Sequence, residues 1–458
     1  MTIKSNGRIN NISQKAQLSR RKIMTKSITR IGICIGVLFM LLACSTKQGQ
    51  DSISVALFQA PASQALIELI PDFEEETGIK VKYEILPYGD LKSKVEQQFF
   101  AQSSNYDVIM ADCIWIPTFA ERNFLGELDT LAYRPTSYDY SDLLPALDDY
   151  LGKYPKGGMR YGMPFMSNTH MLAYRPAIVD PIIKSLNIPK PGLSPETAWT
   201  WDQYFQIAKT ISDEGKGRSP QIFGTSLQAR AGAWLVYEWN SILFGFNQNA
   251  LERDMGLASF SENAAKAMDY YKALYALAPV QSLTWGHEEE TSAICSGLCA
   301  MDATSNVELA ANLLDLNCNT ENEIAFAYPP VGISGVGSPD MGGYGLLLSS
   351  FSKSKQFASA FILWAASKEI HRKIVLNGGS PIRYSEISDQ TILEKFPYLG
   401  FYDRLINDSV YRARVSKWPE LEDIISRELS EVMTGDKKSS EATMSIQKWI
   451  DENIIAHE

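Results

Sequence analysis

The sequence of 458 residues lacks the short motifs that mark the common enzyme classes. It contains no Gly-x-Ser-x-Gly, no His-Glu-x-x-His, no phosphate-binding Gly-x-x-x-x-Gly-Lys, and no Gly-x-Gly-x-x-Gly after a predicted strand. Acidic residues are plentiful, but a pair poised for glycoside cleavage needs a separation in space that a sequence does not reveal. We therefore predict that the protein is not an enzyme, and a lipid-anchored glycoside hydrolase remains the enzymatic alternative.

Metal ligands and paired cysteines are also scarce. The chain has four histidines and no Cys-x-x-Cys pair, so we predict no metal site and no cofactor. Cys34 and Cys44 lie near the N-terminus, and the remaining cysteines are Cys113, Cys295, Cys299 and Cys318. Export would permit disulfides among these four, although we favour buried free thiols.

A single long apolar run occurs, residues 31–43, which at about a dozen residues is shorter than the ~20 that a spanning helix requires. The 43 residues that end with this run contain eight basic and no acidic residues, as in an export signal. Leu41-Leu42-Ala43-Cys44 resembles the lipobox of bacterial lipoproteins, which implies cleavage before Cys44 and lipid attached to it. Met24 begins a better-proportioned leader than Met1 does, so we expect translation to start there.

After the leader, basic residues are fewer than acidic residues. Removal of residues 1–43 takes eight of the 43 basic residues and none of the 53 acidic ones, which leaves a net charge of about −18. This balance argues against nucleic acid or an anionic membrane surface as a partner. We expect a body large enough for two domains on a lipid tether, residues 44–52.

The residues that follow alternate between strand and helix patterns. Expected strands at 53–58, 80–86 and 106–111 alternate with helices at 64–77, from Asp90 onward, and at 113–123. This order predicts an α/β fold with a mainly parallel sheet covered on both faces. Further along, the sequence predicts a capping box at Thr200–Gln203, strands at 222–227, 298–303 and 324–327, and two closing helices at 418–433 and 441–454.

Tyr161 to Tyr174 combines Pro164, an apolar run and the polar residues 167–170 in mid-chain. An α/β pattern precedes it and another follows, so we interpret it as extended chain crossing between two lobes, with ligand bound at the crossing. A strand and loop inside one domain is the alternative. Gly342-Gly343-Tyr344 leads into a second candidate crossing.

Polar and aromatic side chains follow the first three strands, where ligands of parallel sheets bind. They are Gln59, Tyr88, Asp112 and Trp115. Asp112 could instead cap a helix, and Trp115 could pack against one. Aromatic faces suit the C–H side of a sugar, while Asp, Asn, Gln and Arg exchange hydrogen bonds with hydroxyls. A neutral ligand rich in hydroxyls is therefore expected.

Several short sequence motifs, in their order along the chain, resemble those of the extracytoplasmic solute-binding proteins of ABC importers. The resemblance is to the branch of that family that binds maltose, other sugars and polyols. They span Ile53 to about Leu429 and include 73–79, 106–109 with Asp112 and Trp115, 126–129, 161–164, 200–202, 297–301, 342–344, 379–383 and 412–421. Cys113 and the cysteines from 295 to 318 depart from that pattern.

The resemblance implies two lobes joined by hinge strands, a periplasmic-binding-protein fold. The N-terminal lobe would comprise 51–166 with about 346–390, and the C-terminal lobe 167–345 with about 391–458. Ligand contacts would fall on Gln59, Asp112, Trp115, Asn168, Trp234, Asn306, Tyr344, Arg383 and Trp418. A monomer anchored outside the cytoplasmic membrane, or held in the periplasm, would close on a carbohydrate or polyol and deliver it to an ABC permease. A surface adhesion lipoprotein without a closing cleft is a further alternative.

Overall fold

The computed structural model describes residues 51–128, 139–217, 219–246, 262–314, 318, 324–332 and 339–454. From Ser52 onward the chain forms one compact unit. Within the described residues, no helix combines the length and the apolar character that crossing a membrane requires. The leader, Cys44 and both candidate start codons lie outside the described residues.

The first strands and helices alternate as the sequence predicts. The elements are β1 (Ser52–Phe58), α2 (Pro61–Thr77), β2 (Lys80–Leu86), α3 (Tyr88–Phe100), β3 (Val108–Asp112) and α4 (Ile116–Glu121). β1 pairs in parallel with both β2 and β3. α2 begins at Pro61, whose fixed φ suits a first helical position, and ends at Gly78, which has a φ of 73°. We call the elements around these three strands the first lobe.

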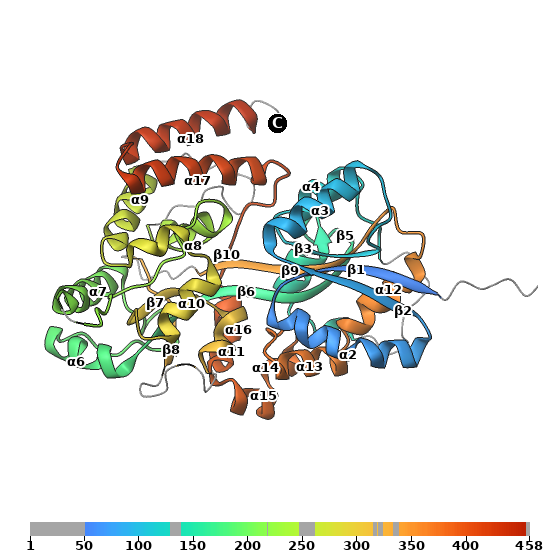
Figure 1. The fold of residues 1–458 in the computed structure, drawn as a ribbon, viewed down its shortest axis with the longest axis horizontal. Helices are drawn as coiled ribbons and strands as arrows, with labels where there is room; N and C mark the ends of the chain where they lie inside the picture. The colour runs from blue at the N-terminus through green and yellow to red at the C-terminus, as the bar shows by residue number, and fades with distance from the viewer. Residues whose placement is uncertain are drawn as a thin grey trace, which may run out of the picture. The chain divides into compact units, whose positions relative to one another are not determined.

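The crossing strand is β6 (Gly162–Tyr174), and all of its residues are buried. Residues Gly162 to Thr169 pair antiparallel with β9 (Asp340–Leu348). From His170 onward, β6 pairs instead with β7 (Met301–Asn306) and β8 (Ala325–Ala327). β9 also pairs with β3, so β6 and β9 extend from the first lobe into a second group of elements, as Figure 1 shows.

The second group, which we call the second lobe, contains β7 and β8 with their helices. These are α6 (Pro176–Leu186), α7 (Trp201–Gly215), α8 (Ala233–Gly245), α9 (Glu262–Tyr275), α10 (His287–Cys295) and α11 (Ala310–Leu313). The capping box predicted at the start of α7 is present, with both bonds between Thr200 and Gln203 formed.

The prediction of a strand at 222–227 is wrong. Phe223 makes one isolated bridge to Cys299, and the segment forms no named strand. The segment keeps a short backbone pairing with 298–301, in which Phe223 donates to Leu298 and Ser226 donates to Met301, both at 2.9 Å. On its other side, the Gly224 N–H donates to Ser212 Oγ on α7 at 2.8 Å. A Cβ at Gly224 would lie 1.9 Å from the carbonyl oxygen of Ala208, so the segment packs closely on α7.

The C-terminal part covers both lobes and supplies a third crossing. On the first lobe, α12 (Lys355–Ala365) packs on β9 and α2, and α13 (Lys368–Leu376) packs on α2. The chain continues through α14 (Tyr384–Ile387), α15 (Gln390–Lys395) and α16 (Tyr402–Asp408). β10 (Val410–Tyr411) then pairs in parallel with the start of β9. Beyond it, α17 (Trp418–Thr434) and α18 (Ser439–Asn453) pack on α9 of the second lobe (Figure 1).

Shorter elements complete the described chain. α5 (Pro145–Gly152) lies against β6, and a small hairpin is formed by β4 (Lys153–Tyr154) and β5 (Met159–Arg160). Four 3-10 turns occupy Tyr140–Asp142, Val280–Thr284, Val307–Leu309 and Pro397–Phe401.

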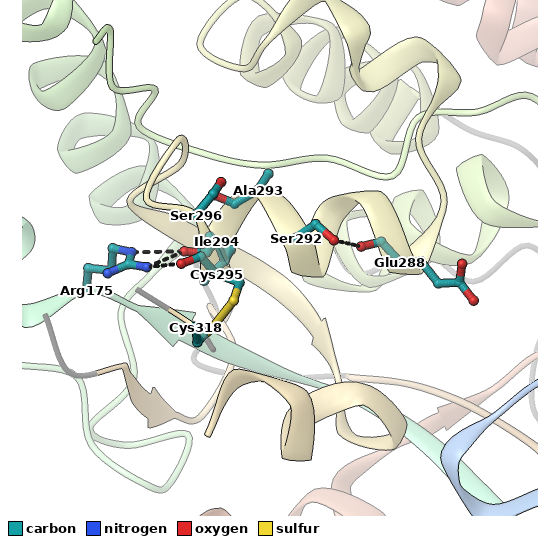
Figure 2. Close-up of a disulfide and its surroundings, with 8 residues drawn as sticks. All are labelled: Arg175, Glu288, Ser292, Ala293, Ile294, Cys295, Ser296 and Cys318. Carbon is teal, nitrogen blue, oxygen red and sulfur yellow. Dashed lines mark hydrogen bonds between the residues drawn. A yellow bond between two sulfur atoms is a disulfide. The ribbon is translucent and has the colours of Figure 1, made fainter. Parts of the chain in front are cut away.

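One disulfide joins Cys295, at the end of α10, to Cys318, while Cys113 and Cys299 are buried free thiols. The sequence preference for free thiols is thus correct for two cysteines and wrong for the other two. Figure 2 shows Arg175 beside this bridge, with Nε 2.9 Å from the carbonyl oxygen of Ile294. A second nitrogen of Arg175 donates to the carbonyl oxygen of Cys295 at 2.6 Å. A cation at this position stabilises the carboxyl end of α10.

Candidate ligand-binding site

A pocket with about 300 Å³ of empty space, part of it open to solvent, lies where the three crossing strands meet. β6 contributes Asn168, β9 contributes Gly342 to Tyr344, and Arg412 follows directly after β10. The first lobe adds Tyr88 and Asp112, and the second lobe adds side chains from α8 and α10. The full lining is Tyr88, Asp112, Asn168, Ala233, Trp234, Tyr237, His287, Gly342, Gly343, Tyr344 and Arg412.

Glycine is required on the β9 side of the pocket. Gly343 has a φ of +131°, and a Cβ there would lie 2.5 Å from the carbonyl oxygen of Met166 on β6. The Gly343 carbonyl oxygen accepts the N–H of Cys113 at 3.0 Å, directly after β3. Gly343 thereby lets β9 lie close to β6 while it fixes the turn that carries Asp112.

Asp112 ends β3 and has partners on both carboxylate oxygens. The Tyr88 hydroxyl donates to Oδ2 at 2.9 Å, and a guanidinium nitrogen of Arg412 lies 3.4 Å from Oδ1. Burial raises the pKa of Tyr88, so its hydroxyl keeps the proton that it donates. The helix-cap alternative for Asp112 has weak support, since the N–H of Ile114 is 3.3 Å from Oδ1. Asp112 thus faces the pocket as an oriented acceptor.

Arg412 is 5% exposed and is surrounded by acids. Besides Asp112, it lies 4.0 Å from Asp340 and 3.8 Å from Glu422, and its guanidinium stacks on Tyr237 at 4.9 Å. Burial raises the pKa of Asp340 to about 8 and the pKa of Glu422 to about 7. Near neutral pH the raised pKa values favour the uncharged forms of these two acids, so Asp112, at 3.4 Å, is the acidic side chain nearest to the guanidinium.

Aromatic rings line the opposing sides of the pocket. Tyr88 and Trp234 come from different lobes, and their ring centroids are 5.4 Å apart. Tyr344 stacks on Phe58 with centroids 4.9 Å apart, which fixes its ring in the pocket wall. Flat apolar faces with polar groups between them are what a sugar or polyol requires.

Asn168 supplies an acceptor that no described residue satisfies. Its side chain is 4% exposed and lines the pocket, and its Oδ1 has no hydrogen-bond partner among the described residues. A buried polar atom without a partner costs about 1–3 kcal/mol. A hydroxyl of a bound ligand would offset that cost.

His287 begins α10 and is oriented from behind by Asn306. The amide nitrogen of Asn306 lies 2.6 Å from His287 Nδ1, and Glu308 Oε1 lies 3.8 Å from His287 Nε2. Burial lowers the pKa of His287 well below its usual value, so the ring is neutral. Burial raises the pKa of Glu308 to about 8. The second lobe thus presents an uncharged imidazole to the pocket.

Residues 58–371 match the family described as bacterial extracellular solute-binding protein. The chain belongs to this family. A mannitol-binding protein of Pseudomonas aeruginosa is 23% identical over 332 residues, which is 70% of each chain. A probable amino-acid ABC transporter periplasmic-binding protein of Sinorhizobium fredii is 22% identical over 364 residues, 77% of each chain.

Among solved structures, an ABC transporter solute-binding protein of Agrobacterium radiobacter in complex with ribitol superposes with a TM-score of 0.76. It is 23% identical, and the match covers 87% of this chain and 97% of that one. This likeness shows the fold: two α/β lobes of a periplasmic-binding protein, as the sequence predicts.

In this solute-binding protein, four of the nine predicted contacts line the pocket: Asp112, Asn168, Trp234 and Tyr344. Two others contact lining residues from behind: Asn306 contacts His287, and Trp115 packs on Tyr88 with centroids 5.2 Å apart. Trp418 lies further back, where its indole N–H donates at 3.3 Å to Glu422, which is 3.8 Å from Arg412.

Gln59 and Arg383 do not line the pocket. The Gln59 side chain is exposed, and its backbone N–H bonds to the carbonyl oxygen of Leu86. Arg383 is 1% exposed and donates to the carbonyl oxygens of Ala366 and Asp139. Its guanidinium is therefore occupied in holding together segments of the first lobe.

Sequence reasoning gave no binding role to Arg412, Tyr237 or His287, all of which line the pocket. In the sequence, Arg412 stands out only as the first residue of the motif at 412–421, which contains arginine, an aromatic residue and proline. For His287, the available signal was a position directly after Gly286 at the start of a helix. Long-range pairing with Asp112, Asn306 and Asp340 decides these placements, and a local pattern does not report it.

Proposed function

We propose that this solute-binding protein captures one uncharged monosaccharide or short polyol in the pocket and delivers it, chemically unchanged, to an ABC permease. The observation that carries the proposal is the combination of aromatic walls, the oriented Asp112 and the unpaired acceptor of Asn168 in one pocket. The names of the mannitol-binding relative and the ribitol complex support the same ligand class.

The charge around the pocket favours a neutral ligand over an amino acid. An amino acid would need a cation free to bind its carboxylate, and the Arg412 guanidinium already lies 3.4 Å from Asp112. Hydroxyl groups, in contrast, can donate to Asp112 and Asn168 and do not need an unpaired cation. We therefore do not propose for this chain the amino-acid ligand that the name of the Sinorhizobium fredii relative indicates.

The small volume of the pocket argues against an oligosaccharide. Its enclosed space amounts to about 20 Å³, which is room for about one water molecule. We therefore propose that the lobes separate to admit a ligand, and that the ligand is a single sugar ring or a short linear polyol.

We propose that the mechanism is closure of the two lobes, with hinges in β6, in β9 and at β10. The proposed N-terminal lobe is 51–166 with about 346–390, and the proposed C-terminal lobe is 167–345 with about 391–458. Tyr88 and Trp234 contact each other from opposite lobes, so a ligand that contacts residues of both lobes would favour the closed form. The permease would then recognise the closed form.

Membership of an extracellular family is consistent with export by the N-terminal leader. We propose that residues 1–43 are removed and that a lipid on Cys44 holds a monomer outside the cytoplasmic membrane. Mass spectrometry of the exported protein checks the modification, and mass spectrometry of the unprocessed precursor identifies the start codon. An unmodified Cys44 in the exported protein would contradict the anchor.

A thermal-shift screen of polyols, monosaccharides, oligosaccharides and amino acids tests the ligand class. We expect the melting temperature to rise with a neutral polyol or monosaccharide, because a ligand that binds only the folded state stabilises it. A rise only with amino acids, or only with oligosaccharides, would refute the proposal.

A further inference from the structure

The imidazole of His287 is held in the pocket wall by its own helix and by two aromatic rings. His287 is the first residue of α10, and the backbone N–H of Gly286 donates to Glu289 Oε2 at 2.8 Å, which fixes the start of that helix. The ring meets that of Trp234 edge-on with centroids 4.2 Å apart, and that of Tyr237 edge-on at 5.8 Å. Contacts of this geometry give the imidazole a defined orientation in the pocket.

One of the two ring nitrogens of His287 is already occupied. The side-chain amide nitrogen of Asn306, the last residue of β7, lies 2.6 Å from Nδ1. An amide nitrogen donates, so Nδ1 accepts through its lone pair. Burial keeps the pKa of His287 well below its usual value, so the neutral ring carries a single hydrogen. That hydrogen is therefore on Nε2, because the bond made by one ring nitrogen sets the tautomer of the other.

Glu308 favours the same tautomer. Its Oε1 lies 3.8 Å from His287 Nε2, which is beyond the ~2.7–3.2 Å of an N–H···O hydrogen bond. Both side chains are buried, so a carboxyl oxygen at this distance attracts a hydrogen on Nε2 and would repel a lone pair. Among the described residues, none accepts a hydrogen bond from Nε2. The Nε2–H group of a residue that lines the pocket is thus left for another acceptor.

Two of the other polar atoms of the pocket are acceptors. The carboxylate of Asp112 extends from the first lobe, and Asn168 Oδ1 on β6 has no partner among the described residues. A hydroxyl group donates one hydrogen and accepts through its oxygen. Acceptors alone satisfy only half of this capacity, and an N–H group on the second lobe satisfies the other half.

We propose that His287, held by Asn306 in the tautomer with hydrogen on Nε2, donates a hydrogen bond to an oxygen atom of the ligand. The site then selects a ligand that presents an oxygen lone pair toward α10 and a hydroxyl hydrogen toward Asp112. A protonated amine has no lone pair, so the α10 side excludes it. Asn306 acts through His287 as a positioning residue. The tautomer stands without the proposed function, and donation to a ligand hydroxyl rests on it.

The first test needs no ligand. The chain has four histidines, so NMR spectra of protein with isotope-labelled histidine contain few ring signals, and those missing from His287→Gln belong to His287. Chemical shifts of the ring carbons and nitrogens report which nitrogen carries hydrogen. We expect hydrogen on Nε2 in the wild-type protein at pH 7. Hydrogen on Nδ1, or an even mixture of the two forms, would overturn the inference.

Asn306→Asp tests the positioning role with the same spectra. A carboxylate only accepts, so we expect hydrogen to appear on Nδ1 of His287 in this variant. A loss of packing alone would not produce that signature. A His287 spectrum identical to that of the wild-type protein would overturn the role of Asn306.

The second test compares two variants of nearly equal length, His287→Gln and His287→Met, in calorimetry with ribitol and with D-mannitol. The Gln amide donates from about the position of Nε2, whereas the Met side chain has no donor. We expect His287→Gln to bind within about threefold of wild type and His287→Met to bind about tenfold more weakly. Equal affinities of the two variants would overturn the inference. Failure of both polyols to bind the wild-type protein would instead refute the proposed ligand class, and the NMR spectra would still decide the tautomer.

Discussion

Replacement of Asp112 by Asn tests whether the carboxylate of this residue binds the ligand. The carboxylate accepts from Tyr88 at 2.9 Å and faces Arg412 at 3.4 Å, and the amide keeps its size while it loses the charge. A hydrogen bond to a charged group contributes about 1.5–3 kcal/mol, so the dissociation constant should rise by about 10- to 150-fold.

Calorimetry with the ligand found by screening measures the change. The matched control is Asp90→Asn, an exposed acid in the first turn of α3, the helix that also carries Tyr88. We expect this control to bind within about twofold of wild type, and both variants to fold. An Asp112→Asn protein with unchanged affinity would show that Asp112 does not contact ligand, and the pocket would lose its main acceptor.

Three further predictions concern other parts of the structure. Arg412→Leu should lower the free energy of unfolding by about 3–5 kcal/mol, because it leaves buried acids without their counter-ion. Since the pKa values of Asp340 and Glu422 are raised to about 8 and about 7, urea unfolding should show a larger loss at pH 9 than at pH 5, and a loss independent of pH would contradict the charge assignment. Trp234→Ala should weaken binding by at least about tenfold in calorimetry, through lost apolar and aromatic contact, whereas Trp449→Ala on α18 should not; equal effects would argue against an aromatic wall. Replacing Cys295 and Cys318 together by Ser should lower stability by about 3 kcal/mol, as expected for a crosslink between residues 23 apart, and stability equal to that of Cys299→Ser would refute a bridge.

The sequence predicts those parts of the fold whose causes are local. The alternation at the start of the chain, the capping box at Thr200 and the two closing helices all rest on spacing within about one element, and all are present. The crossing strand is also predicted, because Pro164 and the polar residues 167–170 exclude a helix and leave only extended chain.

Elements decided by distant partners could not be predicted. β10 has two residues, and only its pairing with Asp340 and Met341 makes it a strand. Conversely, 222–227 has the composition of a strand, yet it makes a single bridge, from Phe223 to Cys299, and packs against α7 through Ser212. The same holds at the pocket, where Arg412 meets Asp112 across 300 residues of chain.

Arg383 illustrates the opposite error. A buried arginine in a conspicuous turn is typical of a ligand contact, but here backbone carbonyl oxygens and Asp142 surround its guanidinium. Whether an arginine faces a ligand or braces a loop depends on which carbonyls the fold brings near it, and composition does not contain that information.

Calorimetric titration of the chain from Ser45 onward with ribitol, D-mannitol, monosaccharides, sugar phosphates and amino acids tests the central claim most directly. We predict a dissociation constant near micromolar, about −8 kcal/mol, for at least one uncharged polyol or monosaccharide, and no measurable heat with the charged compounds. Binding of a charged compound alone, or of no neutral hydroxyl-rich ligand, would contradict the account.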